Sequence, residues 1–361
     1  MMCACSIPRQ PSSRRPELAV LIVNAGSTSL KLSAVADDGS AELVDSLAAL
    51  PAGIEAVGHR VVHGGVRFRE PVVIDDQVER QLAELTELAP LHQGPALRAL
   101  ADARNALPDV PHVAVFDTAF HATLPEVAST YALPRRWRDG WGIRRYGFHG
   151  LSVQWAAEQV RVRRLVVCHL GGGCSVTAVH AGRSVDTTMG FTPREGVPMA
   201  TRSGSVDPGA LSHVLRAGRL SAEELDHELE HASGLLGLSG LSGNVEELES
   251  SAEPLARLAL GVFSYRIAGA VASMAAALGG IDALVFTAGI GEHSARVRAD
   301  VCARLGFLGV ALDEDANRTA GPDAEIAAAG SRVRLVVVRA REDLVAARAV
   351  RGLLGLRTSG R

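Results

Sequence analysis

Two segments of the chain repeat one local pattern, and this repeat restricts the fold more than any other feature. In each segment an apolar run is followed by a turn of small residues and a second apolar run. The first leads from Val20–Val23 into Leu30–Val35, and the second from Leu165–Cys168 through Gly171–Gly173 into Ser175–Val179. Each is typical of a β-hairpin whose turn can hold a phosphate. Because the hairpins lie about 145 residues apart, we expect a duplicated domain with both turns facing one cleft.

The remainder of the chain alternates predicted strands and helices. Short β-branched runs, separated by helical stretches such as Val78–Leu88, occur at Leu18–Val23, Val113–Phe116, Leu165–His169, Ala283–Thr287 and Val333–Val338. This alternation predicts an α/β fold. At roughly 150 residues per domain, a chain of 361 residues predicts two domains.

Charge and cysteine content favour small-molecule chemistry in a reducing compartment. The 37 basic and 40 acidic residues are spread along the chain and give a formal net charge of −3, so we expect no nucleic-acid surface and no basic membrane patch. The five cysteines are odd in number and lack the paired spacing of a zinc site. We therefore predict reduced thiols and a cytoplasmic location, with Cys168 and Cys174 in the core.

Two further segments could be mistaken for targeting or membrane elements. Residues 255–278 are apolar and helical in pattern but include Arg257 and Arg266, which predicts a buried helix of a globular domain rather than a membrane span. Residues 1–16 contain Arg, Ser and Pro without an apolar core, which predicts a disordered tail rather than a signal peptide.

Lys31 is the one lysine of the chain, and the other 36 basic residues are arginine. It closes the run Asn24–Lys31, in which Gly, Ser and Thr follow a predicted strand. Small residues let backbone N–H groups and hydroxyls approach a phosphate closely, and a compact ammonium is not interchangeable with a planar guanidinium. We interpret the run as a phosphate-contacting loop, with chance survival of a single lysine as the alternative.

The common phosphate-loop and serine-hydrolase motifs are absent. The sequence has no G-x-x-x-x-G-K-[ST] or G-x-S-x-G, and its one H-E-x-x-H match is His227–His231. A third glycine turn, Ala288–Glu292, follows a strand, precedes a helix expected near Ser294 and approximates the dinucleotide-binding G-x-G-x-x-G. A Rossmann fold is disfavoured, because Ser294 replaces the last glycine and no βαβ unit begins there. Phosphate binding therefore requires another architecture.

Charged or imidazole groups stand beside small residues at several predicted element ends, where functional sites usually lie. Taken together, these clusters resemble the acetokinase family, which belongs to the acetate and sugar kinase, Hsp70 and actin superfamily. The resemblance extends from about Val20 to about Arg348. It rests on eight motifs: Asn24–Lys31, His59–Gly65, Leu88–His92, Phe116–His121, Tyr146–Gly150, Gly190–Arg202, Ser233–Gly240 and Phe286–Glu292.

The resemblance implies an α/β fold of two RNase H-like (actin-like ATPase) domains with a nucleotide cleft between them. It implies reversible, Mg²⁺-dependent phosphoryl transfer from ATP to acetate, giving acetyl phosphate and ADP by direct in-line transfer, with closure of the domains around the nucleotide. We expect a first domain of residues 17–121 plus 343–361, because the last helix returns to it, and a second domain of residues 122–342. A homodimer is also implied, with no nucleic-acid or membrane partner.

Transfer of a phosphoryl group to a carboxylate brings two anions together, so the site must neutralise charge on the moving group. Arg60 and Arg202 match the two catalytic arginines of the family, and His149 matches the histidine that hydrogen-bonds the phosphoryl group. Asp117 belongs to the same catalytic set, and His92 and His169 match two supporting histidines. Singly, Asp117 is also consistent with a helix cap, Arg202 with a surface ion pair and His149 with a core histidine. Their joint placement favours catalysis.

The resemblance also assigns binding residues. Asn24 and Glu342, together with Asp117, match positions that hold Mg²⁺ largely through water, with Mn²⁺ as an alternative. The apolar pocket for the acceptor carboxylate, beside Arg60, comprises Val62, Leu91, Phe148 and Pro193. Contacts to the nucleotide and its phosphates are expected from Ser27, Ser29, Lys31, His169, Gly171, Gly172, Gly173, Asn244, Gly289, Ile290 and Gly291.

Departures from the family pattern gather on the nucleotide side. Gly172 and His293 each replace an Asn, Asn244 stands where an acidic residue is expected near the ribose, and Arg341 replaces an Asn before Glu342. The choice between ATP and GTP therefore stays open, as does that between acetate and propionate. The alternatives are another short-chain acid kinase, a different kinase or Hsp70-like ATPase on this fold, and a non-catalytic nucleotide-binding relative. Histidines without a family match are expected to be packing or surface residues: His63, His112, His180, His213 and His231.

Replacement of the single lysine tests the phosphate-loop interpretation. We expect Lys31→Arg to lower the rate of phosphoryl transfer although the charge is kept, because a guanidinium is wider than the space beside a tight turn. Steady-state kinetics of the purified variant would measure this. Activity equal to the unsubstituted protein would show that the lysine has no special role.

Overall fold

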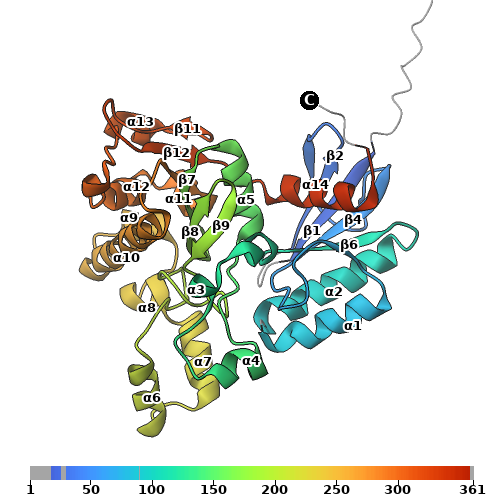
Figure 1. The fold of residues 1–361 in the computed structure, drawn as a ribbon, viewed down its shortest axis with the longest axis horizontal. Coiled ribbons are helices and arrows are strands. Elements are labelled where there is room, and N and C mark those ends of the chain that lie inside the picture. Colours follow the sequence, from blue (N-terminus) through green and yellow to red (C-terminus); the bar gives the residue numbers. More distant parts are fainter. Residues whose placement is uncertain (1–17, 26–29, 89, 358–361) are drawn as a thin grey trace, which may run out of the picture.

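The computed structural model describes residues 18–25, 30–88 and 90–357, without the side chains of residues 87–92. The predicted tail at residues 1–16 and the predicted phosphate contacts Ser27 and Ser29 lie outside the described residues, as do the side chains of Leu91 and His92. The chain forms two α/β halves, each built on a six-stranded sheet (Figure 1).

The two sheets have the same strand order. The first is β3-β2-β1-β4-β6-β5, with strands Ala19–Ala25 (β1), Leu30–Ala36 (β2), Ala41–Val44 (β3), Ile54–Val61 (β4), Val72–Val73 (β5) and His112–Phe116 (β6). The second is β11-β12-β10-β7-β8-β9, with strands Arg164–Leu170 (β7), Cys174–His180 (β8), Arg183–Thr187 (β9), Ala283–Thr287 (β10), Ala324–Glu325 (β11) and Arg334–Val338 (β12). Read from the opposite edge, the second order repeats the first strand for strand, which confirms the predicted duplication.

Each sheet combines an antiparallel meander with a parallel centre. The hairpins β1-β2 and β7-β8 are antiparallel, with Asn24 opposite Lys31 and Leu170 opposite Cys174, so both predicted hairpins are confirmed. Strands β4 and β6 continue in parallel from β1, and β10 and β12 from β7. The carboxyl ends of three neighbouring strands therefore meet at one edge of each sheet.

Helices cover both faces of each sheet. Those associated with the first sheet are Asp76–Glu84 (α1), the 3-10 helix Leu85–Leu88 (η1), Pro90–Ala106 (α2) and Glu342–Leu354 (α14). The connection to the second sheet contains the 3-10 helix Ala119–Thr123 (η2), Glu126–Ser129 (α3), Arg135–Trp141 (α4) and Gly150–Gln159 (α5). The second half contains Pro208–Arg216 (α6), Ala222–His231 (α7), Gly234–Ser239 (α8), Val245–Ser250 (α9), Pro254–Leu278 (α10), Ala288–His293 (α11), Ala295–Cys302 (α12), the 3-10 helix Gly306–Leu308 (η3) and Glu314–Thr319 (α13).

Strand β1 shows why its apolar run is nearly continuous. Alternate side chains of a strand point to opposite faces. Val20 and Ile22 pack with the C-terminal helix α14, whereas Leu21 and Val23 pack with α2. Helices on both faces of a strand require apolar residues at every position. The last helix thus returns to the first sheet, as the sequence predicts (Figure 1).

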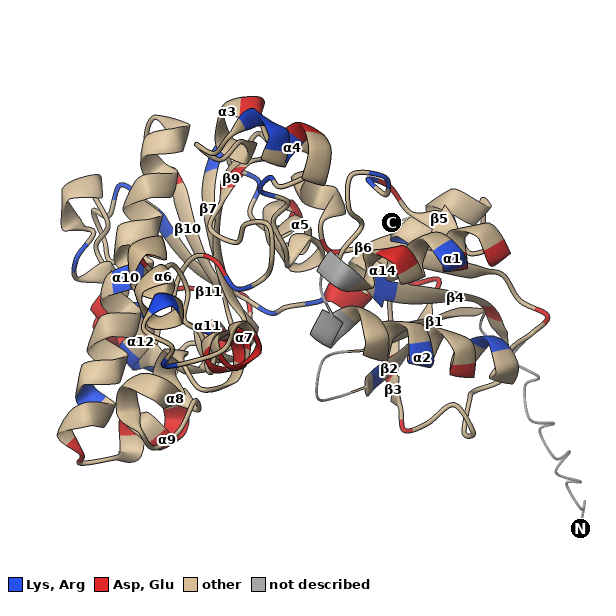
Figure 2. Ribbon diagram, turned by 90° about the horizontal axis from the view of Figure 1, so that it is seen from below, with Lys and Arg blue, Asp and Glu red and all other residues tan. Residues whose placement is uncertain are grey.

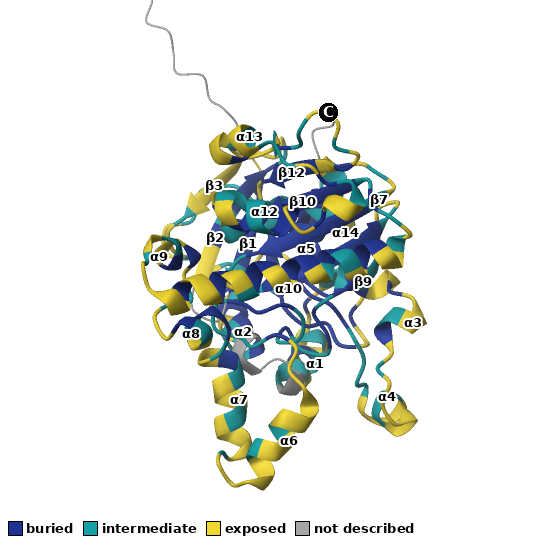
Figure 3. Cartoon of the chain, turned by 90° about the vertical axis from the view of Figure 1, so that its left-hand side faces the viewer, coloured by how far each residue is buried: buried dark blue, intermediate teal, exposed yellow. Residues whose placement is uncertain are grey.

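Helix α10 is the longest helix described. It is long and apolar enough to cross a membrane by length and composition, yet half of its most apolar stretch is buried inside the protein. Its inner face packs on the second sheet, as predicted for a helix of a globular domain. Its outer face is exposed (Figure 3). Several residues there are apolar, among them Leu255, Leu258 and Tyr265.

Helix α5 packs against both halves. Leu151 belongs to the apolar cluster that joins α14 to the first sheet, while Val153 and Ala156 pack with strands of the second sheet. A single helix therefore connects the two cores.

Two local features differ from the sequence prediction. The prediction of a turn at Ala288–Glu292 is wrong, because these residues form the short helix α11 and the next helix begins at Ala295. Strand β4 is not evident from the apolar pattern, since His59 and Arg60 interrupt it. His59 and Arg60 are polar residues inside a sheet. A buried histidine pair explains the position of His59.

His59 on β4 and His112 on β6 form this pair. Their rings stack with centroids 5.2 Å apart, and His59 Nε2 lies 2.9 Å from His112 Nδ1. His112 Nε2 lies 3.0 Å from the carbonyl oxygen of Leu107, which can only accept, so this nitrogen carries the proton. His59 Nε2 must then be the donor within the pair, and its buried Nδ1 has no partner among the described residues. Burial lowers the pKa of His59 to about 3 and also lowers that of His112.

The histidine pair predicts a pH dependence of stability. Both rings are neutral at pH 7, whereas an unfolded histidine has a pKa of about 6.5 and binds protons first as the pH falls. The stabilisation is therefore complete above pH 6.5 and is lost as the pH falls towards 3, by up to about 1.4 kcal/mol per pH unit for each histidine. Urea denaturation at pH 7.5, 6 and 5 should show the decrease.

The variant His59→Gln should make this decrease shallower. His213→Gln, at an exposed position of α6, is the matched control and should leave the slope unchanged. Identical slopes for His59→Gln and the unsubstituted protein would contradict the prediction.

Candidate active site

A cavity of about 630 Å³ lies at the carboxyl ends of the central strands of both sheets. In parallel α/β sheets this edge is the usual position of a ligand site. Fifteen of the residues singled out from the sequence line it: Asn24, Lys31, Arg60, Val62, Asp117, Phe148, His149, His169, Gly171, Gly172, Gly173, Pro193, Arg202, Gly289 and Glu342. Residues up to 318 positions apart are thus brought into one cavity.

Three predicted nucleotide contacts do not line this cavity. Asn244 is the N-cap of α9, and its side-chain oxygen accepts a hydrogen bond from the backbone N–H of Glu246 at 2.9 Å. Ile290 is half-buried against the core of the second half, and the carbonyl of Gly291 accepts a hydrogen bond from Arg298. Their proposed contact with a nucleotide remains a prediction.

Arg60, near the end of β4, is surrounded by oxygen acceptors. Its Nε and Nη2 donate to the two carboxylate oxygens of Asp117 at 2.8 and 2.5 Å, and its Nη1 donates to Asn24 Oδ1 at 2.9 Å. Glu342 lies 3.7 Å from Arg60 Nε and accepts a hydrogen bond from Asn24 at 3.4 Å. Burial lowers the pKa of Arg60, but the two carboxylates outweigh it and raise that pKa above its ordinary value. The guanidinium therefore stays charged and fixed in direction.

The oxygen atoms around Arg60 are also candidate ligands of a divalent cation. No group of three or more His, Cys, Asp or Glu side chains spaced to hold a metal occurs in the described part of the chain. Two carboxylates and an amide oxygen nevertheless converge, those of Asp117, Glu342 and Asn24. Mg²⁺ commonly takes one or two carboxylates and completes its shell with water and substrate phosphates. The donor set therefore fits Mg²⁺ better than a metal that needs an all-protein site.

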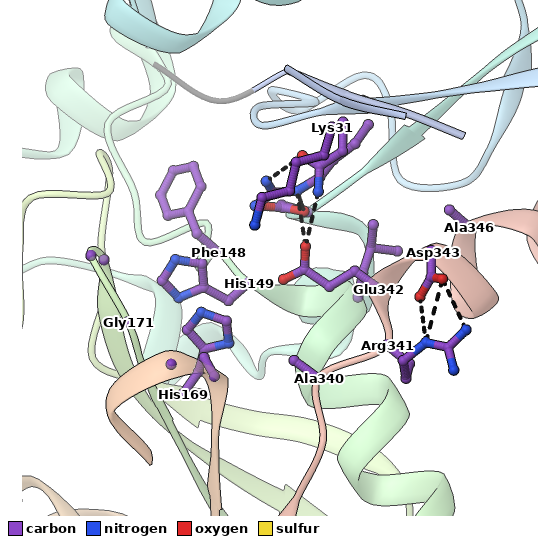
Figure 4. A pocket seen from close by; sticks show the side chains of 18 of the residues that line it. Lys31, Phe148, His149, His169, Gly171, Ala340, Arg341, Glu342, Asp343 and Ala346 are labelled. Carbon is purple, nitrogen blue, oxygen red and sulfur yellow. Dashed lines mark hydrogen bonds and ion pairs between the residues drawn. The ribbon is translucent and has the colours of Figure 1, made fainter. Parts of the chain in front are cut away.

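Glu342 and Asp343 are adjacent at the start of α14 but face different partners. Glu342 points towards the Arg60 cluster, whereas Asp343 forms an ion pair with Arg341 at 3.0 Å (Figure 4). Both line the cavity. Because the carboxylate of Asp343 is neutralised by its own neighbour, Glu342 is the one placed to act with Asp117 and Asn24.

His149 and His169 stack face to face, with ring centroids 4.0 Å apart (Figure 4). His149 Nδ1 lies 3.1 Å from the hydroxyl of Ser175, and His169 Nδ1 lies 2.8 Å from that of Ser152. Burial and the nearby positive charges lower the pKa of His149 well below its ordinary value, and burial and Arg60 lower that of His169 to about 4. Both rings are neutral at pH 7. When the serines donate, each Nε2 carries a proton and becomes a neutral donor.

The position of His149 depends on Gly150. The Gly150 N–H donates to the carbonyl oxygen of Asp117 at 2.9 Å, and a Cβ at Gly150 would lie only 2.2 Å from that oxygen. His149 itself has a left-handed backbone with φ of 59°, which is uncommon for a residue with a side chain. This close contact holds the histidine beside the carboxyl end of β6.

Arg202 enters the cavity from the loop between β9 and α6. Its Nη1 donates to the carbonyl oxygen of Pro193 at 2.6 Å, and its Nε lies 3.3 Å from Glu230. A Cβ built on Gly173 would lie 3.2 Å from Arg202 Nη2 and 3.1 Å from His149 Nε2. The two donor nitrogens therefore meet at Gly173, and Nη2 is the nitrogen of Arg202 that faces the cavity.

The apolar pocket predicted for the acceptor is present in part. Val62, Phe148 and Pro193 line the cavity, and Val62 and Phe148 belong to one buried cluster. His63, expected to be a packing residue, is fully buried with its ring 5.4 Å from that of Phe148. It supports the pocket wall from behind.

Several lining residues were not predicted from the sequence. They include Ile22, Ser33 and Leu43 from the first half, and Glu292, Ala340 and Ala346 from the second half and α14. Glu292 stands in the glycine-rich run, and its carboxylate accepts a hydrogen bond from the N–H of Ala340 at 2.9 Å. The signal in the sequence was an acidic residue beside glycines, but the backbone N–H that it binds lies 48 positions away.

A glycine-to-alanine substitution tests this geometry. We expect Gly173→Ala to lower the rate of phosphoryl transfer about 10-fold or more, because the methyl group would displace His149 and Arg202 by tenths of an ångström. Gly140→Ala, in helix α4 and outside the cavity lining, is the control, since a Cβ there meets nothing within 4 Å among the described residues. Equal turnover numbers for the two variants would contradict the assigned meeting point.

Comparisons with known proteins identify the family to which the chain belongs. The model of the acetokinase family matches residues 41–348. The chain is 50% identical over 311 residues to the acetate kinase of Gloeobacter violaceus, covering 82% of this chain and 76% of that protein. It is also similar to the crystal structure of a propionate kinase from Francisella tularensis, with a TM-score of 0.85 and 31% identity, covering 92% of this chain and 98% of that one. The crystal structure of an acetate kinase from Porphyromonas gingivalis has a TM-score of 0.83 and 32% identity, with 93% of this chain and 100% of that one covered. With its duplicated fold and the family model covering most of its length, the chain belongs to the acetokinase family.

Proposed function

We propose that this chain catalyses reversible, Mg²⁺-dependent phosphoryl transfer from ATP to acetate, giving acetyl phosphate and ADP by direct in-line transfer. One observation carries the proposal. Two arginines from opposite halves, Arg60 and Arg202, line one cavity with the neutral His149 and an apolar pocket.

The arrangement suits a reaction between two anions. An acceptor carboxylate and a phosphoryl group repel each other, and guanidinium groups offset that repulsion as charge spreads over the equatorial oxygens. Arg60 and Arg202 supply the positive charge, while Asp117 fixes Arg60 by a two-point contact. A neutral His149 can donate a hydrogen bond without itself needing a counter-ion. His169, and His92 in the proposed set, would support it.

The size of the acceptor is set by the apolar wall. Val62, Phe148 and Pro193, with Leu91 as a fourth proposed member, would surround a methyl group. An additional methylene changes discrimination by only about 1–3 kcal/mol, so we expect propionate to be accepted more weakly. The similarity to a propionate kinase structure makes this second substrate worth direct comparison.

Asn24, Asp117 and Glu342 would hold Mg²⁺, or Mn²⁺ in its place, mainly through water. When bound, the ion would neutralise phosphate charge and help to orient the phosphate chain. The nucleotide phosphates would lie along Gly171–Gly173 and Gly289, beside Lys31 and the proposed contacts Ser27 and Ser29. The base and ribose are proposed to approach Asn244, Ile290 and Gly291.

The remaining proposals concern the whole protein. The domains would comprise residues 17–121 plus 343–361 and residues 122–342, closing around the nucleotide with α5 packed against both. A homodimer would cover the exposed apolar face of α10. The buried, unpaired Cys168, Cys174 and Cys302 are consistent with a cytoplasmic location.

Trapping of acetyl phosphate as its hydroxamate tests the reaction directly. The purified chain with ATP, Mg²⁺ and acetate should give hydroxamate, with less from propionate, and GTP in place of ATP would report nucleotide preference. Absence of acyl phosphate with every acid and nucleotide would refute the proposed activity.

Substitution of the two arginines tests the mechanism in the same assay. We expect Arg60→Ala and Arg202→Ala each to lower turnover by about 10³-fold or more, the scale of a transition-state arginine, without unfolding the protein. Arg216→Ala, at an exposed position on α6, is the control and should retain full activity. Near-normal turnover of both active-site variants would contradict the proposed roles.

A further inference from the structure

The guanidinium of Arg202 is held on two sides by other groups of the second half. One side is the carbonyl of Pro193, which accepts from Nη1 at 2.6 Å. The other is the carboxylate of Glu230, whose Oε1 lies 3.3 Å from Nε. Only Nη2 is left facing the cavity, next to Gly173 and His149. The direction of this catalytic donor is therefore set by what holds Nε and Nη1.

Glu230 connects Arg202 to a second arginine. Its other oxygen, Oε2, accepts a hydrogen bond from Arg194 Nε at 3.1 Å. Arg194 also pairs through Nη2 with Asp226, one turn earlier on α7, at 2.9 Å. Arg194 follows Pro193 directly, so the residue that accepts from Arg202 and the residue that holds Glu230 are neighbours in the chain. Two carboxylates and two guanidinium groups thus form one connected network.

The carboxylate of Glu230 stands where a helix disfavours it. Glu230 lies in the last turn of α7, at the negative end of the helix dipole, and only 7% of it is exposed. An unpaired buried carboxylate there would be strongly destabilising. The other acidic residues of α7 are exposed to solvent. Figure 2 shows how rich this helix is in Asp and Glu. The ion pairs with Arg194 and Arg202 stabilise the buried carboxylate of Glu230 at this position.

The backbone around Arg202 is fixed without the Glu230 carboxylate. The hydroxyl of Thr201 donates to the carbonyl oxygen of Glu230 at 2.9 Å, and the N–H of Ser203 donates to that of Leu229 at 3.0 Å. These bonds dock the loop on the end of α7 through backbone atoms. Removal of the Glu230 charge should therefore release the side chain of Arg202 while the loop stays in place.

We propose that Glu230 is a positioning residue for phosphoryl transfer, which aims Arg202 Nη2 at the transferring group while Arg194 and Asp226 hold Glu230 in place. Glu230 acts through Arg202 and does not touch the reacting atoms. The inference rests on the proposed role of Arg202 in the transfer. It assigns a function to a salt-bridge network that the sequence motifs did not identify.

Kinetics of Glu230→Gln test this inference. The amide keeps the shape but loses the charge-assisted contact to Arg202, so we expect kcat to fall about 10- to 100-fold while KM for ATP and acetate changes less than about 3-fold. Glu228→Gln, an exposed position on the same helix, is the matched control and should behave as the unsubstituted protein. Arg194→Gln should lower kcat in the same direction by about 3- to 10-fold.

A double-mutant cycle distinguishes positioning from a general structural role. In the Arg202→Ala background, Glu230→Gln and Arg194→Gln should cause no further loss of kcat, because the residue through which they act is gone. Losses that multiply with that of Arg202→Ala would overturn the inference, as would an unchanged kcat in Glu230→Gln. If Glu230→Gln fails to fold, the same comparison with Arg194→Gln decides. Near-normal activity of Arg202→Ala itself would instead refute the proposed role of that arginine.

Discussion

The contact between Arg60 and Asp117 is the interaction on which the site depends. Strands β1, β4 and β6 are neighbours in parallel, and Asn24 stands opposite Arg60 in their register. Asp117 follows β6 and engages Arg60 at two points, while Glu342 arrives with α14. Each of these charges would be costly if buried alone, but together they leave a fixed guanidinium with oxygen donors beside it. The proposed Mg²⁺ ligands and the arginine proposed to contact the phosphoryl group therefore share one cluster.

The second half of the site is joined to this cluster through backbone contacts. Gly150 approaches the carbonyl oxygen of Asp117 so closely that no side chain fits, and this places His149 next to His169 on the second sheet. Helix α5 then packs on both cores. Arg202 completes the group from a loop docked on α7. Closure of the two halves would therefore act on residues that are already aligned.

Particular residues show how far the sequence could be interpreted. Both hairpins and the buried helix α10 follow from local patterns, because strand and helix periodicities depend on neighbouring residues, whereas the return of α14 was implied by the family resemblance. The sequence predicts a turn where the structure has the helix Ala288–His293, because glycines are typical of turns. This short helix is stabilised by distant contacts such as that from Arg298. Asn244 was assigned near the ribose by the family resemblance, and the structure adds that its side-chain oxygen caps α9, a local contact that the sequence analysis did not identify.

The sequence by itself determined the α/β class and the duplication, because these depend on residue type and short-range spacing, and its resemblance to the acetokinase family indicated the candidate site residues. Tertiary structure alone decided which groups share the cavity and how each is oriented. It separated Glu342 from Asp343 by giving the second its own arginine, and it revealed Glu230 behind Arg202. Long-range ion pairs leave no periodic signal in a chain, since their partners meet only after the sheets and helices have packed.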